Sequence, residues 1–420
     1  MAFSSFGDWL GLLATTALAQ ELSGGNYKKA NFAIAGVFIV RLLPAVFLGP
    51  IAGVIADRFD RRRLMILCDV LRFGLYLSIP LVGNYLWLYT ATVLVETVTL
   101  FWSPAKEASV PNLVPKNKLE SANQVSLLAA YGTAPIAALV FSILALFSAG
   151  FSNIIPSQYA STADLALYID ALSFLYTAWV VLGLKEIPRG ASSQTASQQN
   201  IGRSLIEGFK FVNSSKVIRG LILGMLGAFF AAGAVIGLAR TFVGDLNAGD
   251  AAYGVLFGSV FTGLALGISF GPKLLAPFSR RRLFGASLTI SSIFLILLAL
   301  ITNLVLAIFL VVFLGAFAGV SWVSGFTMLG SEVEDEVRVR TFAFVQSLIR
   351  ITLVLVLAVA PAIAAWIGRH TFKFKNLEIT YNGAAFTMLA AGIVGVIVGT
   401  ISYLQMRDRP TVSFWSDIAA

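Results

Sequence analysis

The chain has 420 residues, of which 58% are hydrophobic and 12% are charged, and its formal net charge is +9. Soluble domains are about 45–50% apolar and about 25% charged, so this composition excludes a water-soluble domain. It also excludes a disordered chain, which would need low hydrophobicity. The apolar runs are apolar on every face, unlike the alternating strands of a membrane β-barrel.

Apolar runs between polar breaks predict twelve transmembrane helices, and the protein is expected to be all-α. In chain order they are 3–22, 31–55, 64–83, 85–104, 121–150, 166–185, 217–238, 251–276, 283–302, 304–329, 341–368 and 383–406. Residues 1–185 and 217–406 would then form two six-helix bundles, a pattern typical of transporters built from repeats. Polar residues 186–216 read as a linker and 407–420 as a tail.

Most of the 30 Lys and Arg residues fall on one side of the membrane, in every second predicted loop and in the linker and the tail. By the positive-inside rule, the linker and both termini lie in the cytoplasm. The net charge therefore reflects topology, and we expect a lipid bilayer rather than a nucleic acid as the partner. Ala17–Ala19 resembles a signal-peptidase site, but no Lys or Arg precedes it. We interpret this segment as an uncleaved first helix, with a native start upstream of Met1 as one hypothesis.

One loop motif is especially informative. Residues 53–63, GVIADRFDRRR, fit the pattern G-x-x-x-D-R-x-G-R-R-[KR], except that Asp60 stands at the second glycine. Here the sequence resembles the major facilitator superfamily. The resemblance implies two pseudo-twofold-related six-helix bundles that rock around a central site. The implied gating motif is Gly53, Asp57, Arg58, Arg61, Arg62 and Arg63. Asp57 would help to close the cytoplasmic side by accepting charge-assisted hydrogen bonds. The alternative is that the arginines are only a positive-inside anchor.

A narrower resemblance rests on three segments, FGDW (6–9), RLLPAVFLGPIAG (41–53) and 102–124. They are similar to the drug-exporter branch that includes macrolide-efflux and siderophore-exporter proteins. They also resemble facilitator-type membrane domains fused to thymidylate kinase. The resemblance implies a multi-pass protein of the bacterial cytoplasmic membrane, and we expect a monomer.

Ionisable residues inside membrane spans are costly and are therefore functional candidates: Asp8, Arg41, Glu96 and Arg350. At about 1.5 Å per residue, Arg41 and Glu96 both lie near the midplane. The first, second and fourth helices line the cavity of the resembled fold, so we expect an Asp8–Arg41–Glu96 cluster. A carboxylate stays ionised near an arginine and takes a proton when the arginine withdraws. Proton coupling, mainly through Glu96, is one interpretation, and a fixed ion pair that orients helices is the other.

Further residues are predicted to have supporting roles. Asp69 and Arg72 are three residues apart and are expected to form a local ion pair, whereas Asp170 is expected to be interfacial. Gly263, Gly267 and Gly271 recur every four residues, which predicts close helix packing.

The helix predicted over 304–329 carries Phe317, Trp322 and Phe326. These aromatic residues are candidates for an apolar wall of the substrate site, and the alternative is that they face lipid. Arg350 has two alternatives: it faces the cavity, or it pairs with the gating motif.

The sequence contains no ATP-binding G-x-x-x-x-G-K-[ST], no H-E-x-x-H and no G-x-S-x-G, and it has a single histidine, His370. We therefore expect no enzyme activity, catalytic residue, metal site or cofactor. The predicted function is secondary active transport: proton-linked export of small amphipathic or lipophilic molecules by alternating access, with the substrate and protons as partners. The alternatives are a facilitator-type carrier of lipids or metabolites and a membrane module that serves a partner enzyme.

Overall fold

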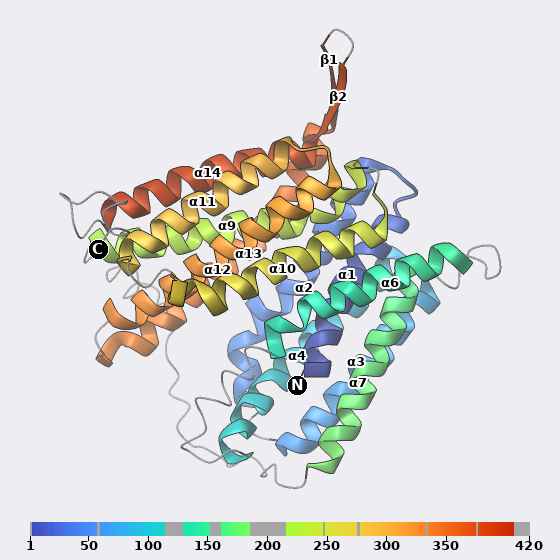
Figure 1. Ribbon diagram of the computed structural model, residues 1–420. Coiled ribbons are helices and arrows are strands. Elements are labelled where there is room, and N and C mark those ends of the chain that lie inside the picture. Colours follow the sequence, from blue (N-terminus) through green and yellow to red (C-terminus); the bar gives the residue numbers. More distant parts are fainter. Residues whose placement is uncertain are drawn as a thin grey trace. The chain divides into compact units, whose positions relative to one another are not determined.

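A computed structural model describes residues 2–56, 59–113, 129–151, 161–184, 216–246, 248–274, 278–332, 335–374 and 377–406. Chain contacts divide the protein into two units. The first comprises Met1–Ser197 and Ala248–Gly258, and the second comprises Gln198–Asn247 and Ser259–Ala420. Each unit is a bundle of helices (Figure 1).

The first unit is built around one set of closely packed helices. They are α1 (Ala2–Glu21), α2 (Tyr27–Ala56), α3 (Arg61–Val82), α4 (Tyr85–Leu113), α6 (Ala134–Phe151) and α7 (Thr162–Gly183). Helix α7 packs along both α1 and α3, while α4 packs against α2 and α3. The first turns of α10 (Asp250–Leu274) also belong to this unit. Residues on α1, α2, α3, α4 and α7 can therefore meet inside one bundle.

The second unit contains the rest of α10 together with five further helices. They are α9 (Lys216–Asp245), α11 (Arg280–Leu300), α12 (Leu304–Glu332), α13 (Asp335–Ile367) and α14 (Gly383–Gln405). Helix α11 lies alongside α12 and α14, and α9 packs against α13 and α14 (Figure 1).

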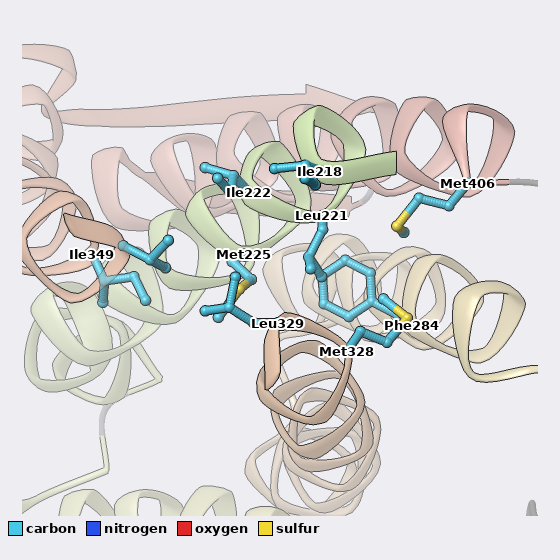
Figure 2. Packing of buried hydrophobic residues seen from close by; sticks show 10 residues of the cluster. Ile218, Leu221, Ile222, Met225, Phe284, Met328, Leu329, Ile349 and Met406 are labelled. Carbon is cyan, nitrogen blue, oxygen red and sulfur yellow. The ribbon is translucent and has the colours of Figure 1, made fainter. Parts of the chain in front are cut away.

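Buried apolar side chains from four of these helices, together with the residue that follows α14, form the core at one end of the second unit. Its members are Ile218, Leu221, Ile222, Met225, Phe284, Met328, Leu329, Val345, Ile349 and Met406. Figure 2 shows the Phe284 ring beside Leu221 within this cluster. Glycines make room for the ring, because a Cβ at Gly325 would lie 2.8 Å from Phe284 Cε2. Close approach of α12 to α11 therefore depends on a residue without a side chain.

The described residues contain twelve helices, as the apolar runs predict, and the all-α membrane fold is confirmed. Ten of the helices are long and apolar enough to cross a bilayer. The remaining two, α1 and α2, carry Asp8 and Arg41. Some predicted boundaries were wrong: the helix predicted to end at 104 continues to Leu113, and the one predicted to end at 238 continues to Asp245.

The segment after α13 was predicted as a loop, but it contains an antiparallel hairpin of β1 (Arg369–Phe374) and β2 (Leu377–Asn382). Arg369 pairs with Asn382, and Phe374 pairs with Leu377. Gly368 precedes the hairpin with φ of 74°, a backbone conformation that favours glycine. The glycine lets the chain leave α13 and enter the first strand directly.

The start of helix α3 shows what Asp60 does in place of the glycine of the facilitator pattern. Asp60 is the N-cap, with φ of −60°, and its side chain accepts a hydrogen bond from the Arg63 backbone N–H at 3.0 Å. Such caps stabilise a helix start by about 1 kcal/mol. The turn therefore needs no positive φ at this position and gains a capping bond from the aspartate.

Candidate functional site

Arg41 joins three helices inside the first unit. Its Nε lies 2.9 Å from Glu96 Oε1 on α4, and both side chains are mostly buried, with 17% and 20% exposed. Its Nη2 also donates a hydrogen bond to the backbone carbonyl of Asp8 on α1, at 3.3 Å. The structure thus brings together the three residues that the sequence grouped, although Arg41 binds the backbone of Asp8 rather than its carboxylate.

A second ion pair lies in the same bundle and is fully buried. Asp69 and Arg72 on α3 pair with each other, as their spacing predicted. The Arg72 guanidinium carbon lies 4.7 Å from the centre of the Trp102 ring and 4.2 Å from that of Phe174. Trp102 Nε1 donates a hydrogen bond to Asp69 Oδ2 at 3.3 Å. The pair is thus held between aromatic rings of α4 and α7, where a cation gains from the ring faces.

Asp170 corrects a prediction made from the sequence. Its expected position was interfacial, but the side chain is completely buried in the middle of α7, where α7 packs against α1 and α3. The missed signal was on the facing helix: Gly7 and Gly11 of α1 are one turn apart and leave space for the carboxyl group. The position of a residue along a helix gives its depth but not the direction in which its side chain points.

The predicted gating motif is described in part. Gly53 lies in α2, while Asp57 and Arg58 lie outside the described residues. At the start of α3, Arg62 Nε donates a hydrogen bond to the Val181 carbonyl at 3.2 Å, and its Nη2 donates to the Leu182 carbonyl. These carbonyls belong to the last turn of α7, where backbone carbonyls lack the usual intrahelical partners. The Val181 carbonyl also accepts a hydrogen bond from the Leu184 backbone N–H at 3.1 Å. Arg62 therefore joins α3 to the end of α7.

The aromatic residues of α12 fall into two groups. Trp322 lies 5.1 Å, between ring centres, from Phe229 on α9 and 5.9 Å from Phe326. Phe317 instead stacks on Phe294 of α11, with ring centres 6.0 Å apart. The structure thus places two of the three predicted wall residues together, and the third packs on another helix. Arg350 on α13 is exposed.

The helical bundles are those of a multi-pass membrane protein, and the family to which the chain belongs is one of transporters rather than enzymes. The model of the transmembrane secretion effector family, within the major facilitator superfamily, matches residues 1–409, and the chain belongs to this family. The resemblance found in the loop motif and in the exporter-like segments is thereby confirmed.

Curated relatives match parts of the chain. The MFS-type transporter YfiS of Bacillus subtilis (strain 168) is 26% identical over 229 residues, which cover 54% of this chain and 49% of YfiS. Macrolide efflux protein A of Enterococcus faecalis is 25% identical over 195 residues, which cover 45% of this chain and 56% of that protein. The matches thus span about half the length of these relatives.

A solved structure resembles the chain over nearly its whole length. The bacterial homologue of the human lysosomal transporter Spinster superposes with a TM-score of 0.69 and 16% identity, covering 97% of this chain and 96% of that one. At this identity the likeness concerns the fold alone, and it supports the major facilitator architecture.

Proposed function

We propose that the protein is a proton-linked exporter that moves small amphipathic molecules out of the cell by alternating access, with Glu96 as the proton carrier. The observation that carries this proposal is the mostly buried ion pair of Glu96 with Arg41, which joins α2 to α4. A relative named macrolide efflux protein A supports the export direction and the substrate class.

The proposed coupling follows from the chemistry of the pair. While Glu96 is ionised, Arg41 holds α4 to α2 and, through the Asp8 carbonyl, to α1. A protonated Glu96 no longer attracts the guanidinium electrostatically, so proton binding weakens the link among three helices. The cation left behind in a low-dielectric interior is costly unless it finds another partner. Protonation of one carboxylate thereby favours a different packing of the same helices.

Transport in proteoliposomes with an imposed pH gradient tests this proposal. Ethidium, a fluorescent amphipathic cation, serves as the probe, and its movement is followed with and without the gradient. We expect gradient-driven movement by the wild type and its loss in Glu96→Gln, which keeps the shape of the protonated acid. Glu21→Gln is the matched control, because Glu21 is an exposed carboxylate at the end of α1. Unchanged gradient-driven transport by Glu96→Gln would remove Glu96 from the mechanism.

The probe experiment also separates the proposal from its alternative. A facilitator-type carrier would equilibrate ethidium in the absence of a pH gradient and would not concentrate it against its own gradient. That result, obtained with the wild type, would contradict proton coupling while leaving the transporter fold unaffected.

A further inference from the structure

The carboxyl group of Asp170 lies directly against the backbone of α1. The side chain is 0% exposed, and neither of its oxygens has a hydrogen-bond partner within the described part of the chain. A Cβ built on Gly7 would overlap Asp170 Oδ1, and one built on Gly11 would overlap Oδ2. The two glycines therefore form the surface on which this carboxyl group rests.

The cations near Asp170 are already engaged by other carboxylates. On α3, Arg72 pairs with Asp69 and lies over two aromatic rings. On α2, Arg41 pairs with Glu96. Neither arginine forms an ion pair with Asp170 among the residues that the structure describes.

The remaining neighbours supply no positive charge either. Helix α1 contributes another acid, Asp8, and α3 contributes the hydroxyl of Tyr76, which would lie 3.1 Å from a Cβ on Gly11. The described stretch of α6, Ala134–Phe151, contains no ionisable residue. An ionised Asp170 would thus face a carboxylate and a phenol, and the arginines whose charge reaches it, Arg41 and Arg72, each already have a carboxylate partner.

An uncompensated carboxylate in such surroundings is very costly, and the group avoids the cost by becoming neutral. A protonated carboxyl is also a hydrogen-bond donor. Ser173 Oγ lies close to Asp170 Oδ1, because a Cβ on Gly7 would overlap both oxygens, and a hydroxyl can accept a hydrogen bond from a protonated carboxyl group. The hydroxyl is buried and has no other partner in the described residues.

We propose that Asp170 binds a proton and forms a second proton-binding site, separate from Glu96, at the contact between α1 and α7. The backbone of α1 covers the carboxyl group, so the proton exchanges with water only when α1 moves away from α7. The site retains its proton while the contact is closed. This proposal does not depend on which molecule the protein transports or on the role of Glu96.

Infrared spectroscopy of the purified protein in detergent tests the proposal, with protons and deuterons as the probes. The difference between wild type and Asp170→Asn at neutral pH should contain the C=O band of one protonated carboxyl group, and in D2O that band should shift slowly. The spectrum of Glu96→Gln should still contain this band. The proposal would be overturned if Asp170→Asn removed an ionised-carboxylate band instead of a protonated one. It would also be overturned if the band assigned to Asp170 responded to added Na⁺.

A second pair of variants keeps the test decisive if Asp170→Asn does not fold. In Gly11→Ala, the new methyl group should displace the carboxyl group, move the protonated C=O band and speed its exchange in D2O. Gly74→Ala is the matched control, since a Cβ at this position in α3 meets nothing within 4 Å. A band that is identical in wild type and Gly11→Ala would show that it does not come from Asp170, and the proposal would fail.

Discussion

Arg72 lies over the ring of Trp102, with 4.7 Å between its guanidinium carbon and the ring centre, while the ring nitrogen of Trp102 donates a hydrogen bond to Asp69, the partner of Arg72. One indole side chain thus contacts both members of a fully buried ion pair, its face toward the cation and its edge toward the anion. The pair can persist in the interior because hydrogen bonds and ring faces replace part of the lost hydration.

This double contact predicts different costs for two substitutions of Trp102. Trp102→Phe keeps a ring face but removes the donor to Asp69, which should destabilise the protein by about 1 kcal/mol. Trp102→Ala also removes the packing and should cost roughly 3–5 kcal/mol. Chemical denaturation in detergent measures both, with Trp366→Phe as the control because Trp366 is 84% exposed. Equal losses for the two Trp102 variants would show that the ring face contributes nothing.

The Arg41–Glu96 pair predicts a non-additive result in a double-mutant cycle. Glu96→Gln leaves the Arg41 cation without its carboxylate, and the loss of one partner of a buried pair costs on the order of 3 kcal/mol. Arg41→Met combined with Glu96→Gln removes both charges, so the double variant should be more stable than the sum of the single losses predicts. Lys28→Met, at an exposed position, is the control for loss of a cation. Additive losses would contradict a direct interaction.

Arg62 predicts a local effect at the end of α7. Its side chain donates hydrogen bonds to the carbonyls of Val181 and Leu182. Arg62→Ala should remove both bonds, leave the Leu184 backbone N–H as the donor to the Val181 carbonyl, and so loosen the last turn. Hydrogen–deuterium exchange read by mass spectrometry should become faster for the peptide covering 178–184 and stay unchanged in α4. Arg63→Ala is the matched control, because the neighbouring Arg63 is exposed. Faster exchange of the α7 peptide in both variants would mean that overall charge, rather than these bonds, determines the result.

The sequence predicted the helices well because a span of about 20 apolar residues is a strong and local signal. Depth was also predictable, since residue count along a helix measures distance, and this brought Arg41 and Glu96 to a common level. The direction of side chains around a helix axis was not predictable. Helices such as α7 are apolar on all sides, so the pattern does not distinguish a face toward lipid from a face toward α1. Asp170 was misplaced because α7 begins at Thr162 rather than at residue 166, which puts the residue deeper than expected, and because its carboxyl group faces α1.

The hairpin after α13 was missed for a different reason. Polar and apolar residues alternate in the second strand, LEITYN, and over the last four residues of the first, RHTFKF, which is a recognisable strand pattern. The strands are short and lie between two long apolar runs, whose helix signal is much stronger. The separation of Phe317 from Trp322 was likewise not readable, because it depends on which neighbouring helix each ring meets.

The charge distribution predicts the side on which the loops lie, and cysteine labelling can measure it. The single native cysteine, Cys68, is buried and should not react with impermeant maleimide. In right-side-out vesicles, Lys28→Cys should be labelled from outside, whereas Ser197→Cys in the linker should be labelled only after permeabilisation. Labelling of both from the same side would contradict the predicted topology.

Gly267 illustrates how helix packing in the second unit depends on a missing side chain. A Cβ on Gly267 would overlap the backbone carbonyl of Ala316 in α12, and one on Gly263 would overlap that of Val312. Because backbone atoms cannot rotate away, Gly267→Ala should force α10 and α12 apart and destabilise the protein by about 1–3 kcal/mol.

A second glycine in the same unit gives the opposite prediction. A Cβ on Gly237 would make ordinary contacts, 3.5 Å from Leu357 Cδ2 and 3.6 Å from Pro361 Cγ. Gly237→Ala should therefore stabilise the helix by about 0.5–1 kcal/mol, since alanine is the better helix former. Denaturation in detergent should show changes of opposite sign for the two alanine substitutions. Changes of the same sign would mean that helix propensity or general overpacking, and not the close approach of α10 to α12, determines the effect.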